Sequence, residues 1–355
     1  MRVIMAGGGT GGHLFPGLAV AQEFLKRDAM TEILFVGTEA GIECRAVPAA
    51  GYPLEILPVR GLKGRGLSGL IEAIYGVPVS VFRSLRIIGR FRPDCIIGLG
   101  GYASGPLLLA GKAKGIGCAV MESNLRPGLT NRTLGRIVDR IFTAYEGSAR
   151  YFPRARVIET GNPVRWQSLP EVRKDAKFTV LIFGGSAGAH RINLCVVEML
   201  KRLGDLAAGL RIIHQTGEAD MEWVRAAYGS FPCEAELLPF INKMDEAYAR
   251  ADLVVCRAGA TTIAELTAFG KPAVLIPYPY AADDHQSLNA EALRERGAAE
   301  VILDQELDGE KLAARIRALY LDRARLAVMA QAARRLGRPE AAKKIVDECY
   351  ALVER

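Results

Sequence analysis

Short apolar runs alternate with longer helical patterns along most of the chain. The runs fall at residues 2–6, 33–36 and 95–97, and again at 178–183, 210–213, 235–238, 253–255 and 273–276. Short apolar runs next to glycine-rich turns are typical of strands that are buried on both faces. Strands that alternate with helices form right-handed βαβ units and a parallel sheet. The pattern therefore predicts an α/β protein.

The same arrangement occurs twice. Residues 2–6 lead into a glycine loop at 7–12 and a helix, and residues 178–183 lead into a second glycine loop at 184–189 and a helix over 191–203. We therefore expect two Rossmann-like, doubly wound domains, at 1–163 and 164–337, and a last helix in 338–355 that packs back towards the first domain. Two such domains leave a cleft between them, and ligands of such domains lie at the carboxyl ends of the strands. We therefore expect a ligand site in this cleft.

Composition and charge narrow the classes of protein. The 355 residues include seven scattered cysteines without a C-x-x-C pair, which favours a reducing compartment and argues against structural zinc. Residues 3–22 and 95–111 are uncharged, but glycine and proline interrupt both stretches. Neither stretch therefore predicts a membrane span or a signal peptide. Residues 1–165 hold 21 Lys and Arg against 12 Asp and Glu, so an anionic partner would meet the first half.

A basic and apolar segment covers residues 60–92, which we expect to be helical from 67 with an interruption near Gly76 and Pro78. Such a segment can lie on anionic lipid headgroups, or it can be an ordinary amphipathic helix with its apolar face in the core. No nucleic-acid-binding motif is present, so we expect no nucleic acid partner. The basic residues are Arg60, Lys63, Arg65, Arg83, Arg86, Arg90 and Arg92.

The first glycine loop satisfies the G-x-G-x-x-G pattern of dinucleotide-binding domains, and Glu39 lies near the place of their ribose-binding carboxylate. However, the loop carries Thr10 and is followed at once by His13. An imidazole titrates near neutral pH, so His13 is a candidate general base, with helix capping as the alternative. In the second loop, Ser186 and the backbone N–H groups predict an anion site, unless the loop is only a structural turn.

Two further segments of the second half carry polar side chains after expected strands. Thr262-x-x-Glu265 is the pattern of a capping box, but Glu265 can also accept from ribose hydroxyls. Gln286 lies in a polar loop and can read sugar hydroxyls. The chain has no Asp-x-Asp pair, Walker A sequence or G-x-S-x-G elbow, which disfavours an NTPase or a hydrolase. A departing diphosphate would then be stabilised by helix N-termini, Ser186 and Arg165.

Several motifs occur together and in order over essentially the whole length, and in them the chain resembles the MurG family of bacterial glycosyltransferases. The family has the GT-B fold of two Rossmann-like domains. The motifs are Gly8-Gly-Thr-Gly-Gly-His13 with Phe15-Pro-Gly-Leu-Ala19, Gly100-Gly-Tyr-Ala-Ser-Gly105, Gly128-Leu-Thr-Asn131, Gly161-Asn-Pro-Val-Arg165, Gly184-Gly-Ser-Ala-Gly-Ala189 and Gly259-Ala-Thr-Thr-Ile-Ala-Glu265.

The resemblance implies transfer of N-acetylglucosamine (GlcNAc) from UDP-GlcNAc to the C4 hydroxyl of the muramoyl sugar of undecaprenyl-diphospho-N-acetylmuramoyl-pentapeptide, with inversion at the anomeric carbon. This step converts lipid I into lipid II in peptidoglycan synthesis. The family works as a peripheral protein at the cytoplasmic face of the cell membrane and needs no metal or other cofactor. Anionic membrane is therefore an expected partner, and proteins of cell-wall synthesis and division are further candidates.

The resemblance also assigns residues. Residues 67–82 match the membrane-associating region, and Met121 and Ser123 stand where the family commonly has His and Gln. Thr10, Gly11, Gly12 and His13 match the loop that faces the acceptor diphosphate and the transferred sugar, and Asn124 contacts the donor from across the cleft. The donor residues are Ile241 at uracil, Glu265 at the ribose, Ala260, Thr261 and Thr262 at the diphosphate and sugar, Gln286 at the GlcNAc hydroxyls, and Arg165 and Ser186 at the donor and its phosphates.

The expected chemistry is an in-line displacement of UDP by an acceptor hydroxyl, through an oxocarbenium-like state. His13 is the expected base, with Glu122 and Asp283 as competitors. The nearest rival is a UDP-GlcNAc 2-epimerase, which shares the twin domains but would need no lipid surface. A dehydrogenase and a non-catalytic membrane scaffold are further rivals.

Overall fold

The computed structural model describes residues 1–354 except 40, 60–65, 167–176 and 186–187. The chain forms two compact units, of which the first comprises Met1–Arg165 and Arg338–Arg355 and the second Trp166–Gly337. The chain passes between the units after Arg165, which belongs to the first unit. Among the described residues, no helix combines the length and the apolar character that a membrane span requires.

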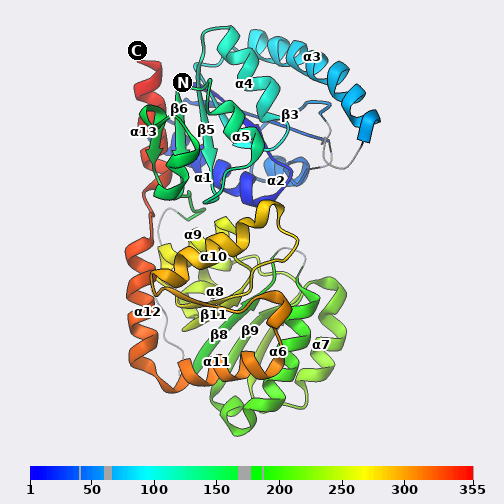
Figure 1. The fold of residues 1–355 in the computed structure, drawn as a ribbon, viewed down its shortest axis with the longest axis vertical. Coiled ribbons are helices and arrows are strands. Elements are labelled where there is room, and N and C mark those ends of the chain that lie inside the picture. The colour runs from blue at the N-terminus through cyan, green and yellow to red at the C-terminus, as the bar shows by residue number, and fades with distance from the viewer. Residues whose placement is uncertain (40, 60–65, 167–176, 186–187, 355) are drawn as a thin grey trace. The chain divides into compact units, whose positions relative to one another are not determined.

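The first unit contains a seven-stranded parallel sheet in the order β3-β2-β1-β4-β5-β6-β7. Its strands are β1 (Arg2–Gly7), β2 (Glu32–Gly37), β3 (Leu54–Ile56), β4 (Cys95–Gly100), β5 (Gly117–Glu122), β6 (Arg140–Thr143) and β7 (Val157–Glu159). Its helices are α1 (Gly11–Arg27), α2 (Glu43–Ala49), α3 (Gly66–Phe91), α4 (Ser104–Ala113), α5 (Leu129–Leu134) and α13 (Ala341–Val353). In Figure 1, α3 and α4 lie side by side, and α13 returns to this unit, where it packs on α1.

Alternate residues of β1 point to opposite faces of this sheet, as the period of a strand requires. Val3 and Met5 belong to one buried cluster with residues of α1 and α13. Ile4 and Ala6 belong to the cluster on the other face, with residues of α3 and α4. Both faces are covered, which explains why the strand is an unbroken apolar run.

The second unit contains a six-stranded parallel sheet in the order β10-β9-β8-β11-β12-β13. Its strands are β8 (Phe178–Phe183), β9 (Leu210–Gln215), β10 (Glu234–Leu238), β11 (Leu253–Cys256), β12 (Ala273–Leu275) and β13 (Ala299–Val301). Its helices are α6 (His190–Leu203), α7 (Met221–Tyr228), α8 (Met244–Arg250), α9 (Ala260–Phe269), α10 (His285–Glu295), α11 (Gly309–Leu321) and α12 (Arg323–Leu336).

Both sheets reverse their strand order at the first strand, where β1 pairs with β4 and β8 pairs with β11. The prediction of two doubly wound, Rossmann-like domains is therefore confirmed. In this fold, ligands bind beyond the carboxyl ends of the strands at the point of reversal. We therefore look for the ligand sites in the loops that follow β1, β4, β8 and β11.

The expected interruption of the helix near Gly76 and Pro78 is wrong, because α3 runs without a break from Gly66 to Phe91 and contains Pro78. Ser84 donates to the carbonyl of Ser80 at 2.8 Å, and Ile87 and Ile88 are buried against the first sheet. Packing of this buried face compensates for the one backbone hydrogen bond that a proline removes.

Candidate functional site

Two glycine loops meet at the switch point of the first unit. The N–H of Gly8, after β1, donates to the carbonyl of Gly100, at the end of β4, over 3.4 Å. A Cβ on Gly101 would lie 2.8 Å from the Gly8 carbonyl oxygen, and Gly101 has a φ of +80°. The two loops can therefore touch only because these positions carry no side chain.

His13 lies in the first turn of α1, against this pair of loops. A Cβ on Gly100 would stand 2.9 Å from Nδ1 of His13, so the ring packs directly on the loop after β4. The N-cap residue Thr10 has an extended backbone and makes no side-chain cap, and the first turn of α1 contains no acidic residue. The structure thus brings Thr10, Gly11, Gly12 and His13 together at a helix N-terminus that suits an anion.

Arg165 lies beside the same helix terminus. Its guanidinium carbon is 4.6 Å from the centre of the Phe15 ring. That ring in turn covers Gly11, where a Cβ would lie 2.8 Å from a Phe15 ring carbon. Arg165 therefore adds positive charge next to the loop that carries His13.

Glu43 is a buried carboxylate that the sequence analysis missed. Its Oε2 accepts from the Gly9 N–H at 2.7 Å, and its Oε1 accepts from the N–H and the hydroxyl of Thr38 at 2.9 and 3.0 Å. Burial raises the pKa of Glu43, but these hydrogen bonds outweigh burial and hold it below its ordinary value. The Gly9 N–H is thus already bonded to a carboxylate of the protein, whereas a dinucleotide-binding loop offers such N–H groups to a pyrophosphate. This bond argues against the dehydrogenase alternative.

Glu122 ends β5 and is almost completely buried. Its Oε1 accepts from the N–H and the side-chain amide of Asn124 at 2.9 and 3.3 Å, and its Oε2 accepts from the Asn131 amide at 2.9 Å and the Gly128 N–H at 3.3 Å. Burial raises the pKa of Glu122 in spite of these bonds. Both oxygens are thus used to shape the loop that carries Asn124, which favours a positioning role over proton transfer.

The two positions that depart from the family pattern are also buried. Met121 packs in the core of the first unit, and the Ser123 hydroxyl donates to the Asn162 side-chain oxygen at 2.9 Å. Their side chains therefore stabilise the unit itself, beside a loop whose Asn124 is half-buried.

The second unit repeats the glycine loop after β8. Gly188 has a φ of +79°, and a Cβ there would lie 2.2 Å from the Thr216 carbonyl oxygen, so only glycine fits. Helix α6 begins at His190 without a side-chain cap and without an acidic residue in its first turn. The described part of the loop therefore ends at a helix terminus suited to an anion, whereas Ser186 lies outside the described residues.

Helix α9 follows β11 and carries four of the predicted donor residues. Its N-cap is Gly259, so Ala260, Thr261 and Thr262 form its first turn. The capping-box interpretation of Thr262 and Glu265 is wrong, because Thr262 lies inside the helix instead of at its N-cap. Glu265 is instead almost completely buried, and its Oε2 accepts from the Tyr248 hydroxyl at 3.1 Å.

Ile241 and Gln286 follow two other strands of the same sheet. Ile241 lies after β10, and its N–H donates to Oε1 of Gln215 at 3.1 Å. Gln286 lies in the first turn of α10, where its Oε1 accepts from the Tyr278 N–H at 2.9 Å. Arg257, also missed, donates to the carbonyls of Ile276 and Pro277 and so braces the same loop.

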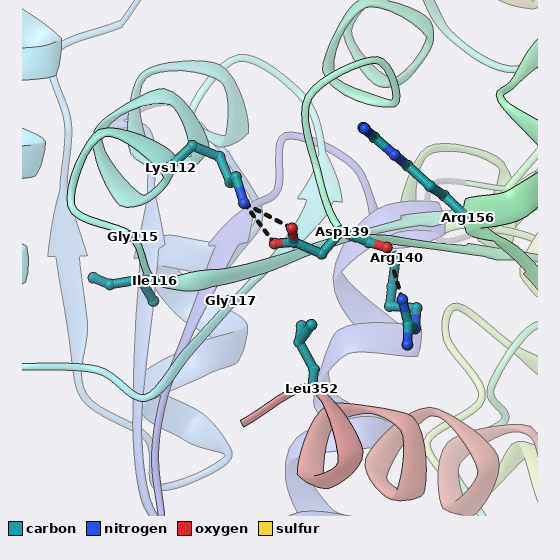
Figure 2. Close-up of a pocket in the computed structure, with 8 residues that line it drawn as sticks. All are labelled: Lys112, Gly115, Ile116, Gly117, Asp139, Arg140, Arg156 and Leu352. Atoms are coloured by element: carbon teal, nitrogen blue, oxygen red, sulfur yellow. Dashed lines mark hydrogen bonds and ion pairs between the residues drawn. The ribbon is translucent and has the colours of Figure 1, made fainter. Parts of the chain in front are cut away.

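A hollow of about 400 Å³ lies at the opposite edge of the first sheet, at the amino ends of β5 and β6 (Figure 2). Lys112 donates to both carboxylate oxygens of Asp139 at 2.7 and 2.8 Å, and Arg156 donates to two backbone carbonyls. Leu352 of α13 packs on Gly117, where a Cβ would lie 3.0 Å from its Cγ. These charged groups bond to one another and to backbone beside the starts of β5, β6 and β7, and the hollow is remote from the loops after β1 and β4.

No group of three or more His, Cys, Asp or Glu side chains that could hold a metal ion occurs among the described residues. The candidate site of each unit consists instead of glycine loops, helix N-termini and single polar side chains at the carboxyl ends of parallel strands. This donor set suits phosphate and hydroxyl groups.

Known protein families match both units of the chain. The glycosyltransferase family 28 N-terminal domain matches residues 3–143, and the glycosyltransferase family 28 C-terminal domain matches residues 179–345. Relatives from Myxococcus xanthus and Geobacter sulfurreducens are 49% and 51% identical over 357 and 362 residues. These alignments cover 99% of this chain in both cases, and 93% and 98% of the two relatives. Both are named UDP-N-acetylglucosamine--N-acetylmuramyl-(pentapeptide) pyrophosphoryl-undecaprenol N-acetylglucosamine transferase.

Solved structures with the same fold include MurG of Acinetobacter baumannii, with a TM-score of 0.82, 32% identity and 99% of both chains covered. The UDP-GlcNAc 2-epimerase of Neisseria meningitidis, bound to UDP-GlcNAc, has a TM-score of 0.70, with 99% of this chain and 100% of that chain covered. Its identity is only 14%, so this second likeness concerns the fold alone.

Proposed function

The chain belongs to glycosyltransferase family 28 and, within it, to the MurG family, and on that premise we propose how its residues carry out the reaction. It is a GT-B enzyme that transfers GlcNAc from UDP-GlcNAc to the C4 hydroxyl of the muramoyl sugar of lipid I and so forms lipid II for peptidoglycan synthesis. The observation that carries this conclusion is an identity of about one half along nearly the whole chain to named transferases of this activity.

The second unit supplies the donor site in our proposal. The diphosphate of UDP-GlcNAc lies at the N-termini of α6 and α9, where uncapped helix ends and the first-turn residues Ala260, Thr261 and Thr262 face it. Glu265 accepts from the ribose hydroxyls, the backbone of Ile241 meets uracil, and Gln286 meets the hydroxyls of the sugar. Negative charge that develops on the leaving UDP is stabilised by these backbone N–H groups.

The first unit supplies the acceptor loop and the base in our proposal. The loop of Thr10, Gly11 and Gly12 faces the acceptor diphosphate, with Arg165 beside it, and Asn124 contacts the donor. An imidazole nitrogen of His13 takes the proton from the C4 hydroxyl of the acceptor. The hydroxyl oxygen attacks the anomeric carbon at the same time, from the side opposite to UDP. The carbon–oxygen bond to UDP breaks as the new bond forms, which inverts the anomeric centre.

Incubation with UDP-GlcNAc alone tests the transferase against the epimerase. A transferase should leave the donor sugar unchanged when no acceptor is present, because its reaction needs the incoming hydroxyl. Analysis of the nucleotide sugars by chromatography or NMR measures this outcome. Accumulation of UDP-N-acetylmannosamine would instead assign the chain to the epimerases and overturn the proposal.

We further propose that α3 attaches the protein to the cytoplasmic face of the membrane as a peripheral protein. Val79 and Phe82 are half exposed on this helix, and Arg83, Arg86 and Arg90 are exposed on it too. The Arg86 guanidinium lies 4.5 Å from the centre of the Phe82 ring. Exposed apolar groups beside arginines suit the headgroup region of an anionic bilayer. Arg60, Lys63 and Arg65 lie outside the described residues.

Replacement of Val79 and Phe82 by serine should weaken binding to vesicles that contain anionic phospholipid by about tenfold or more, because two apolar side chains no longer leave water. Co-sedimentation with vesicles measures the effect. Met30→Ser is the matched control, since Met30 is exposed but lies outside α3. Equal binding by the double variant and the wild type would contradict the assignment of the membrane surface to α3.

A further inference from the structure

Gln215 is a buried amide at the end of β9, with 2% of its surface exposed. Its Nε2 donates to the Gly185 carbonyl at 2.6 Å, and its Oε1 accepts from the Ile241 N–H at 3.1 Å. Since β9 lies between β8 and β10 in the sheet, this one side chain joins the glycine loop after β8 to the segment after β10.

Backbone hydrogen bonds join the two residues after Gln215 to the end of β10. The N–H of Thr216 donates to the Leu238 carbonyl at 3.0 Å, and the N–H of Gly217 donates to the Pro239 carbonyl at 3.2 Å. On the other side, Gly188 packs so closely on the Thr216 carbonyl that no side chain fits between them. Gln215 therefore adds a side-chain bridge to a cradle of three strand ends.

The buried His214, next to Gln215, takes part in a hydrogen-bond network that reaches the Thr216 carbonyl. Burial lowers the pKa of His214 to about 4, so its ring is neutral near pH 7. Its Nε2 lies 3.0 Å from the Asn193 side-chain oxygen, and its Nδ1 lies 3.0 Å from the Tyr228 hydroxyl. Asn193 donates onward to the Thr216 carbonyl at 2.8 Å. The segment that carries Gln215 is thus held in one conformation.

The spacing that Gln215 sets matters for a ligand with an anionic part and a flat base. The glycine loop and the N-terminus of α6 suit a diphosphate, whereas the segment after β10 offers a half-exposed Phe240 and the backbone of Ile241. We propose that Gln215 is a positioning residue for the nucleoside diphosphate of the donor. It holds the two segments at the spacing that UDP spans, without touching the ligand itself. This inference rests on the proposed function and names a further residue of the same donor site.

Two variants separate the parts of this role. Gln215→Ala removes both hydrogen bonds, and Gln215→Glu keeps an acceptor for the Ile241 N–H but places an oxygen against the Gly185 carbonyl. Each variant should weaken the binding of UDP by about tenfold, as expected for the loss of one or two buried hydrogen bonds. UDP-GlcNAc should lose affinity by the same factor, because it shares the nucleotide. The KM for the acceptor and kcat should stay within about twofold of the wild type.

Isothermal titration with UDP, together with thermal unfolding of each variant, measures these effects. Lys271→Met is the matched control. Lys271 is buried just before β12, at the amino edge of the same sheet, and its amine donates to the carbonyls of Ala249 and Ala251. That variant should lower the melting temperature but leave UDP binding unchanged.

The outcomes separate the inference from the function on which it rests. If the wild type binds UDP and folded Gln215→Glu binds it equally well, the positioning role is wrong and the transferase stands. The role is also wrong if Lys271→Met weakens UDP binding as much as the Gln215 variants. If the wild type binds no UDP, the proposed function itself fails.

Discussion

The variant His13→Ala should lose kcat by about 10²–10⁴-fold, which is the usual cost of removing a general base. His13 lies in the first turn of α1 and packs on Gly100, in the loops that we assign to the acceptor. Alanine keeps the helix but has no group that can take the proton of the C4 hydroxyl. Initial rates with a lipid I analogue at saturating UDP-GlcNAc measure the loss.

Donor binding and the pH profile provide the controls for His13. Titration with UDP should give wild-type affinity, because the residues that we assign to the nucleotide, Ile241, Glu265 and the first turn of α9, lie in the second unit. The decline of kcat towards acidic pH, expected when a base becomes protonated, should disappear in the variant. Glu122→Gln is the competing variant. Near-normal kcat in His13→Ala, together with a large loss in Glu122→Gln, would move the base to Glu122.

The variant Glu265→Ala should raise the KM for UDP-GlcNAc by roughly 10- to 100-fold, with a small change in kcat. A hydrogen bond to a charged group contributes about 1.5–3 kcal/mol, and we assign two ribose hydroxyls to this carboxylate. Because Glu265 lies in the interior of α9 and not in its first turn, the loss should concern the donor more than the start of the helix. Steady-state kinetics with varied UDP-GlcNAc measure the change.

Tyr248→Phe is the matched control for Glu265, since it removes the hydroxyl that donates to Oε2 but leaves the carboxylate. It should raise the KM much less than Glu265→Ala does. Should Glu265→Ala instead unfold at a lower temperature with an unchanged donor KM, the carboxylate would have only a structural role.

The glycine loops made the central part of the fold predictable. An apolar run that ends in several glycines and enters a helix marks a first strand of a Rossmann-like domain, and this pattern placed β1 and β8. The strands β3, β5, β6, β7 and β13 were not predicted, and all of them except β5 are only three or four residues long. Neighbouring strands define such short elements more than their own sequence does.

The candidate site was predictable where its residues lie within a local motif. His13, the first turn of α9 and the loop after β5 all follow expected or observed strand ends. Glu43 and Gln215 were missed because their meaning depends on partners 34 and 26–30 residues away. A single Glu or Gln in a sequence has no period or spacing that announces a buried bridge.

The two wrong interpretations were both inferred from local sequence. The structure instead starts α9 two residues before Thr262 and continues α3 through Pro78. A proline inside a helix costs about 3 kcal/mol and a helix cap contributes about 1 kcal/mol, and burial of one helix face can exceed both.

Transfer of radiolabelled GlcNAc from UDP-GlcNAc to a lipid I analogue measures the proposed reaction itself. We expect a labelled lipid product that carries a β-1,4-linked disaccharide, formed equally with and without a chelator. An analogue without the C4 hydroxyl of the muramoyl sugar should accept no label. Label in that deoxy analogue, or no lipid product from the intact analogue, would contradict the account.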